Sequence, residues 1–189
     1  LRDDYWQTRI YPGNRLIFFD QKTSKAFSPF SVQPNVCYGE PIFNDGFFYF
    51  TQVNTKSNEL HIFKYQPEKE AKVIFTCSLN AVNLHNLRLI SSDDSVQLVS
   101  DNDQGTDTKG CTVKGYFPDK FAITYTEDQI PLFMKNHQLY LSDYEERYND
   151  NGDFIKYVYY TCSKDLSNKL ISKKLGSFNL APDGKLWQS

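Results

Sequence analysis

Apolar and polar runs alternate along this chain in a pattern typical of antiparallel strands. The clearest case is Gly39–Leu79, where four apolar runs rich in aromatic and β-branched residues are separated by polar stretches. The first separator, Asn44-Asp45-Gly46, is a strong turn sequence. The apolar runs are Pro41–Phe43, Phe47–Val53, Leu60–Tyr65 and Val73–Cys77. The pattern predicts a four-stranded antiparallel meander of about 40 residues.

Similar hairpin patterns recur further along the chain. Turn residues at equivalent places follow one another with a drifting period of about 45 residues. These residues are Asp45, Asp94, Asn136 and Asp183. No long stretch with helical periodicity competes with this pattern, and only Asn80–His85, within a connector, could take a helical turn. The sequence therefore predicts an all-β protein built from repeated units.

The final segment, NLAPDGKLWQS, is similar to the S-P-D-G-K-x-L inner hairpin of TolB-type blades. The units as a whole resemble β-propeller blades of the TolB, WD40 and kelch kind, although no WD dipeptide and no kelch Gly-Gly pair is present. The resemblance implies a β-propeller and supplies no catalytic residues.

We expect one β-propeller domain over residues 1–189, with about four blades of four antiparallel strands. Its last segment offers an inner hairpin and its first segment an outer one, so the two would complete a shared blade that closes the ring. The expected blades are residues 39–80, 81–128, 129–176, and 177–189 together with 1–34. The alternative is an arc of a larger ring.

Ring closure carries a specific expectation about the two ends of the chain. Phe178–Gln188 should pair in the same sheet as Arg15–Val32, because backbone groups at open edges would otherwise lack partners. Trp187 should then pack against Trp6 or Phe18.

Charge and apolar composition give no sign of nucleic-acid binding or of a membrane span. The formal net charge is −2, and 23% of the residues are charged, which does not direct the chain toward nucleic acid or an anionic membrane. No apolar run approaches the roughly 20 residues of a membrane-spanning helix.

Four cysteines are widely spaced and form no CxxC pair, which disfavours a metal knuckle. They fall in different predicted strands and blades, so we expect free thiols. The four are Cys37, Cys77, Cys111 and Cys162.

The polar stretch Asp101–Gly110 carries acids at alternating positions, namely Asp101, Asp103 and Asp107, with Gly105 between them. Such spacing resembles short calcium loops, in which a hard cation takes several oxygen ligands. The closing glutamate of an EF-hand is absent, and a solvated hairpin loop explains the same residues. Calcium is thus the one candidate cofactor.

A second acidic stretch, Asp143–Asp153, mixes carboxylates with tyrosines and is expected to be a loop on the same face as the first. It is either an exposed excursion or a surface that binds a partner. The candidate partner-binding residues are Asp143, Tyr144, Glu145, Glu146 and Tyr148. Other tyrosines could add to a recognition surface or pack between blades. These are Tyr38, Tyr116, Tyr157, Tyr159 and Tyr160.

Catalytic chemistry has few candidates in this sequence. Glycoside hydrolysis, which some propellers perform, needs two carboxyl groups about 5–10 Å apart, and Glu40 with Glu127 or Asp128 could supply them. The histidines His61, His85 and His137 show no metal or triad spacing. The sequence favours a non-enzymatic module that recognises a protein or glycan through one face; the alternative is a carbohydrate-binding or carbohydrate-active propeller.

Overall fold

The computed structural model describes residues 11–93, 95–102, 110–181 and 183–188, and within these ranges the protein is all-β with one short 3-10 helix, Leu79–Ala81. The chain divides into two compact units, residues 1–83 and 84–189. The division falls inside Asn80–Asn86, which the sequence predicts as a connector. A single propeller domain spanning both units stays a prediction.

The first unit contains the meander predicted around Gly39–Leu79. Asp45 and Gly46 connect its first two strands with φ of +46° and +77°, the left-handed conformation that two-residue hairpin turns require. Strand β5 also pairs with β3, which precedes the predicted meander in the sequence. The strands of this sheet are β3 (Val36–Tyr38), β4 (Ile42–Asn44), β5 (Phe47–Asn54), β6 (Glu59–Tyr65) and β7 (Lys72–Ser78).

Aromatic rings fill the core of the first unit. Phe50 and Phe63 stack with ring centroids 5.5 Å apart, and Phe18 lies 4.6 Å from Phe48 and 5.1 Å from Tyr65. Phe18 belongs to a separate two-stranded sheet of β1 (Phe18–Asp20) and β2 (Lys25–Phe27). Burial of these rings stabilises the unit, because aromatic side chains remove large apolar areas from water.

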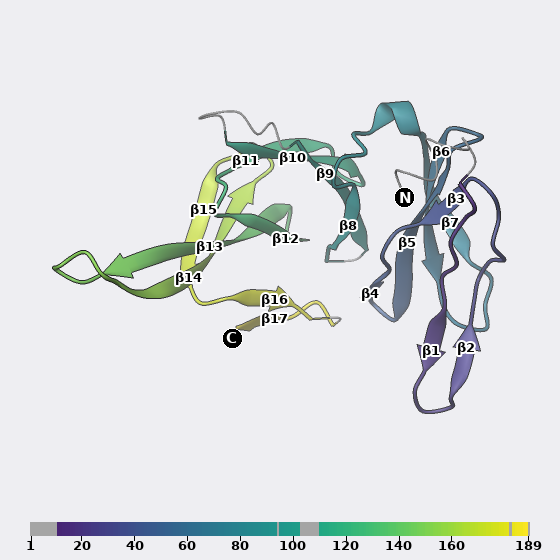
Figure 1. Ribbon diagram of the computed structural model, residues 1–189, viewed down its shortest axis with the longest axis horizontal. Helices are drawn as coiled ribbons and strands as arrows, with labels where there is room; N and C mark the ends of the chain where they lie inside the picture. The colour runs from purple at the N-terminus through teal and green to yellow at the C-terminus, as the bar shows by residue number, and fades with distance from the viewer. Residues whose placement is uncertain (1–10, 94, 103–109, 182, 189) are drawn as a thin grey trace. The chain divides into compact units, whose positions relative to one another are not determined.

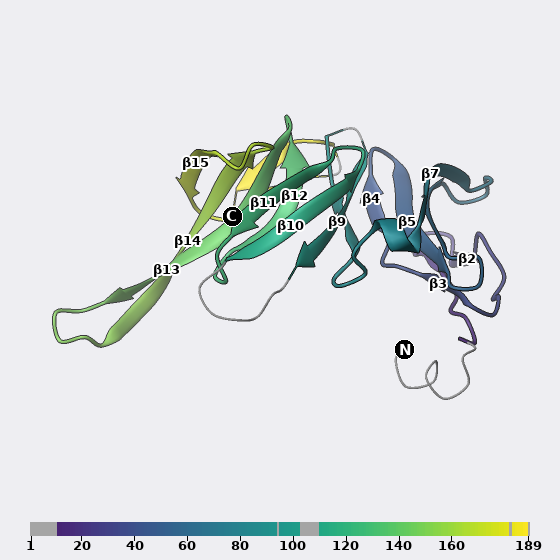
Figure 2. The same ribbon diagram turned by 90° about the horizontal axis from the view of Figure 1, so that it is seen from above.

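The main part of the second unit is a curled sheet of eight strands (Figures 1 and 2). Two successive antiparallel meanders, β8–β11 and β12–β15, join through a parallel contact between β8 and β12, where Ser91 pairs with Phe133. Each meander lies in one of the predicted blades, 81–128 and 129–176. The strands are β8 (Arg88–Ser91), β9 (Val96–Asn102), β10 (Cys111–Phe117), β11 (Phe121–Tyr125), β12 (Ile130–Lys135), β13 (Gln138–Tyr148), β14 (Phe154–Asp165) and β15 (Leu170–Leu175).

A hydrophobic core cluster of the second unit contains residues of both meanders. Val99, Val113, Ile123, Leu139 and Leu141 are fully buried there. They come from both meanders, so the two meanders share one core instead of forming separate layers.

The shared terminal blade is not observed. Strands β16 (Phe178–Leu180) and β17 (Leu186–Gln188) form a two-stranded sheet of their own, as β1 and β2 do. Trp187 is 66% exposed, and the Phe18 ring lies in the core of the first unit against Phe48 and Tyr65. The packing of Trp187 against Phe18 stays a prediction. Trp6 lies outside the described residues. A closed ring is therefore not shown.

All four cysteines are free, as the sequence predicts. Among the described residues, no helix has the length and apolar character needed to cross a bilayer.

Candidate functional site

The acidic stretch Asp143–Asp153 is mostly strand, so its prediction as a loop is wrong. Strand β13 continues to Tyr148 and β14 resumes at Phe154, with Asp143 opposite Tyr160 and Tyr148 opposite Phe154. Alternating side chains and the aromatic and β-branched residues of β14 favour this extended ladder over a loop. We call residues 143–159 the projecting hairpin.

The projecting hairpin extends past the ends of its neighbours (Figure 1). On one side β12 stops opposite Ser142, and on the other β15 reaches only to Tyr160, with one further backbone bond from Gly176 to Tyr159. Among the described strands, residues 144–158 pair only with each other. An isolated two-stranded hairpin is marginally stable in water, so the turn and the side chains must hold it.

The turn of the projecting hairpin is organised by Asn149. Its Oδ1 accepts the backbone N–H groups of Asn151 and Asp153, each at 2.9 Å. Gly152 adopts φ of +84°, a conformation open to glycine at little cost. These contacts fix where the strands reverse and hence which residues face each other.

The strand pleat divides the predicted partner-binding residues into two sets. Asp143 and Glu145 lie on one face of β13, and Tyr144, Glu146 and Tyr148 on the other. We call the first the charged face and the second the aromatic face. The two sets therefore face different surroundings on opposite sides of the hairpin.

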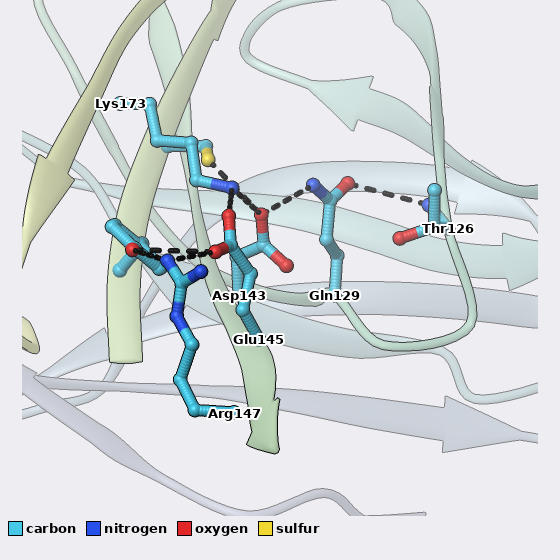
Figure 3. Close-up of polar contacts among 8 residues, drawn as sticks. Thr126, Gln129, Asp143, Glu145, Arg147 and Lys173 are labelled. Atoms are coloured by element: carbon cyan, nitrogen blue, oxygen red, sulfur yellow. Dashed lines mark hydrogen bonds and ion pairs between the residues drawn. The ribbon is translucent and has the colours of Figure 1, made fainter. Parts of the chain in front are cut away.

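Ion pairs satisfy the carboxylates of the charged face (Figure 3). Lys173 Nζ in β15 lies 3.2 Å from Asp143 Oδ2 and 2.9 Å from Glu145 Oε1, and Arg147 lies 2.7 Å from Glu145 Oε2. Gln129 donates from Nε2 to Asp143 Oδ2 at 3.3 Å. This network braces the hairpin where it leaves the sheet.

The same contacts shift the ionisation of the network. The hydrogen bond from Lys173 lowers the pKa of Glu145, and the bond to Glu145 raises the pKa of Lys173. Burial raises the pKa of Asp143, but the hydrogen bonds that Gln129 and Lys173 donate to it outweigh this effect, so its pKa is lowered overall. All three groups are therefore charged at neutral pH.

Cys162 contacts the network but is a poor nucleophile. Burial first, and then its bond to Asp143 at 3.5 Å, raises the pKa of its thiol to about 11. The reactive species of cysteine is the thiolate, which is scarce at neutral pH for such a group.

The aromatic face carries a continuous set of rings. Tyr157 is central, with centroids 5.3 Å from Tyr144, 4.9 Å from Phe154 and 6.3 Å from Tyr159. Tyr148 continues the set, 6.1 Å from Phe154. Four of these rings, all but Tyr144, are between 47% and 53% exposed. Rings with so much free area are available to a ligand.

Two carboxylates accompany these rings. The Tyr144 hydroxyl donates to Asp128 Oδ1 at 3.1 Å, and the Tyr148 hydroxyl donates to Glu146 Oε2. Each bond raises the pKa of its tyrosine. Both hydroxyls therefore stay protonated at neutral pH, beside acidic groups.

The other tyrosines noted in the sequence divide between surface and packing. Tyr157 and Tyr159 join the aromatic face, whereas Tyr160 lies on the charged face, where its hydroxyl accepts from Arg147 at 3.3 Å. Tyr38 is buried in the core of the first unit, and Tyr116 bonds Ser100 at 3.0 Å. Alternation of aromatic residues along β14 was the available signal for this division.

The calcium candidates are only partly described. Asp101 is buried and forms an ion pair with Arg88 at 2.5 Å, which removes one carboxylate oxygen from a metal site. Asp103 and Asp107 lie outside the described residues. Within the described part of the chain, no group of three or more acidic, histidine or cysteine side chains is placed to hold a metal ion.

The candidate catalytic groups occupy separate surroundings. Asp128 is bonded to Tyr144, while Glu127 lines a shallow cavity of about 350 Å³ with Asp101 and Tyr125. Glu40 belongs to the other unit.

The three histidines have different partners. His61 contacts the Thr76 hydroxyl, His85 contacts the Asp101 carbonyl, and His137 contacts the Asp119 carboxylate. Across the described residues these contacts form no catalytic triad.

Comparison with protein-family models, curated proteins and solved structures finds no match for this chain.

Proposed function

We propose that this chain is a non-enzymatic, propeller-type binding module that recognises a macromolecular partner through the aromatic face of the projecting hairpin. The observation that carries the proposal is the set of half-exposed rings on residues 148, 154, 157 and 159. At 150–250 Å² per aromatic side chain, half-exposed rings leave roughly 300–500 Å² of contiguous aromatic surface. Surfaces of this kind mark interaction sites, and aromatic residues dominate binding hot spots.

The position of the rings strengthens the proposal. A protruding hairpin can enter a concave partner. Its rings expose apolar surface to water, so their burial by a partner would be favourable. Rings that contact one another are already ordered, so binding immobilises few additional side chains. Tyrosine also combines apolar area with a hydroxyl that hydrogen-bonds to water, which suits a surface that is exposed to solvent when no partner is bound.

Groups near the hairpin that could perform chemistry are engaged in structural contacts. Asp143 and Glu145 are held in ion pairs, and Cys162 keeps its proton. This favours recognition over turnover. A glycan ligand is the second candidate, because aromatic rings lie beside the carboxylates of Glu146 and Asp128.

Affinity capture with matched variants tests the proposal. The double variant Tyr148→Ser/Tyr157→Ser removes two rings of the aromatic face, and Trp187→Ser removes a ring elsewhere that is more exposed than either. Proteins retained by the wild type and by Trp187→Ser should be lost from the double variant, with circular dichroism confirming that all three are folded. Equal capture by the double variant, or no specific capture by the wild type, would contradict it. A glycan array run with the same three proteins tests the second candidate.

The propeller architecture is a separate part of the proposal. Two consecutive meanders whose first strands run parallel support blades arranged side by side. Deletion of residues 180–189 distinguishes a ring from an arc. A ring closed by residues 177–189 and 1–34 would unfold or aggregate, whereas an arc of a larger ring would keep its melting temperature and monomeric state.

A further inference from the structure

We infer that the aromatic face binds a cationic peptide segment, whose arginine or lysine side chains stack on the tyrosine rings and pair with Glu146. The inference rests on the proposed function and names the chemistry of its partner.

The first argument is the sign of the charge on this face. Glu146 lies between Tyr144 and Tyr148 on β13 and directly opposite Tyr157 on β14. It is the one charged side chain that the pleat places on this face of residues 143–159, all of which are described. Asp128, bonded to Tyr144, adds a second carboxylate. A cationic ligand would thus meet negative charge among the rings.

The cations nearby are placed elsewhere. Arg147 and Lys156 lie opposite each other in the ladder, on the charged face, where Arg147 forms an ion pair with Glu145. Lys173 is held by Asp143 and Glu145. Lys174 is on the same side of the sheet as the aromatic face. It lies in β15 opposite Thr161, however, beyond the base of the ring set. Among the described residues, no protein cation therefore competes with a ligand cation along the aromatic face of the projecting hairpin.

The rings themselves suit a cation. The negative face of a tyrosine or phenylalanine ring attracts ammonium and guanidinium groups within about 6 Å of its centroid. This chain already uses such contacts internally. Lys64 Nζ lies 3.8 Å from the Phe47 centroid, and Lys173 Nζ lies 4.4 Å from that of Tyr160. The exposed rings of the aromatic face offer the same interaction to a partner.

Other occupants fit the charge less well. An apolar partner would bury Glu146 without a counter-charge, which is costly. A second copy of this chain using the same face would bring Glu146 toward its own symmetry mate, since a two-fold interface repeats each patch against itself. A neutral glycan could bond the hydroxyls but would leave the carboxylates unneutralised. A cationic peptide satisfies rings and carboxylates together.

Fluorescence anisotropy with defined peptides tests the inference. The probes are labelled, extended peptides of about 10 residues, long enough to cover the strands of the hairpin. They alternate serine with arginine, lysine, citrulline or glutamate. Citrulline keeps the size and planar shape of the arginine side chain but is neutral. We expect the arginine peptide to bind most tightly, and the citrulline peptide to bind about tenfold or more weakly. The glutamate peptide should not bind.

Matched variants locate the contact. Glu146→Gln should weaken arginine-peptide binding about fivefold or more, whereas Glu68→Gln, the same charge change at an exposed acid of the first unit, should alter it less than about twofold. Tyr148→Ser/Tyr157→Ser should abolish measurable binding, and Trp187→Ser should not. Equal affinity for the arginine and citrulline peptides, or an unaffected Glu146→Gln variant, would overturn the inference.

The remaining outcomes separate this inference from the proposed function. If no peptide binds but captured proteins still depend on Tyr148 and Tyr157, the cationic partner is wrong and the binding face stands. Binding of a glycan in place of the peptides, or a dimer in sedimentation velocity that the double variant loses, would likewise replace the partner and keep the face. If the double variant binds the peptides and captures proteins as well as the wild type does, both the cationic partner and the binding face are wrong.

Discussion

Lys173 Nζ lies 3.2 Å from Asp143 Oδ2 at the point where the projecting hairpin leaves the eight-stranded sheet. Asp143 and Glu145 are same-face neighbours on β13, and their carboxylates would repel each other without a cation between them. Lys173 comes from β15, so it ties the start of the hairpin to the edge of the sheet. Both the order of the hairpin and the orientation of the aromatic face depend on this contact.

Replacing this lysine should therefore loosen the hairpin. Lys173→Met keeps most of the side-chain volume and removes both ion pairs, so the melting temperature should fall by about 2–4 °C. Amide hydrogen exchange in residues 143–159 should accelerate more than elsewhere. Lys174→Met, the neighbour whose register is that of the opposite face, is the control and should change neither measurement. Equal effects of the two variants would mean that Lys173 does not brace the hairpin.

The network also predicts a pH dependence. The pKa values of Asp143 and Glu145 are lowered in the folded protein, so their contribution to stability is present above their unfolded pKa values and disappears as the pH falls through the folded ones. The pKa of Lys173 is raised, so its contribution is present below its unfolded value and disappears as the pH rises through the folded one.

The difference in unfolding free energy between the wild type and Lys173→Met should accordingly be constant from about pH 5 to pH 10. It should shrink below about pH 4, as the carboxylates take up protons. Denaturant titrations at several pH values measure it. A difference that persists undiminished at pH 2 would argue against ion pairing as its source.

The turn of the projecting hairpin should be sensitive at Gly152. At its φ of +84° an added Cβ meets no neighbouring atom, so the cost of Gly152→Ala is backbone strain alone, about 1 kcal/mol. Asp150→Ala in the same turn places no side chain at a positive φ and serves as the control. Thermal unfolding compares the two, and a neutral Gly152→Ala variant would indicate a turn of another conformation.

The pairing of β10 with β11 can be tested at Gly115. A Cβ at this position would lie 2.3 Å from Cε1 of Phe121, its partner in the ladder. Gly115→Ala should destabilise the second unit by about 1–3 kcal/mol, and adding Phe121→Leu should recover part of the loss. Destabilisation that Phe121→Leu leaves unrelieved would contradict this register.

Local turn chemistry explains which parts of the fold were predictable. The meander of β4–β7 was expected from Asn44-Asp45-Gly46, because an Asp-Gly pair accepts the left-handed conformation that a two-residue hairpin requires. The terminal pairing is not shown, and it depends on contacts between segments far apart in the sequence. Phe18 is buried against Phe48 and Tyr65, and no local pattern shows which rings will meet.

The candidate site was found by composition but misassigned in structure. The density of acids and turn formers in Asp143–Asp153 suggested a loop, although Tyr144, Glu146 and Tyr148 already alternate as a strand does. That Asp143 and Glu145 are neutralised could not be foreseen, since their partner Lys173 is on another strand.

Hydrogen exchange of the chain with and without the bound arginine–serine peptide tests the central claim most directly, because it locates the contact without altering the protein. We predict that exchange slows in residues 143–159 and stays unchanged in β16, β17 and the first unit. Slowing confined to those other regions, with the projecting hairpin unchanged, would contradict the account.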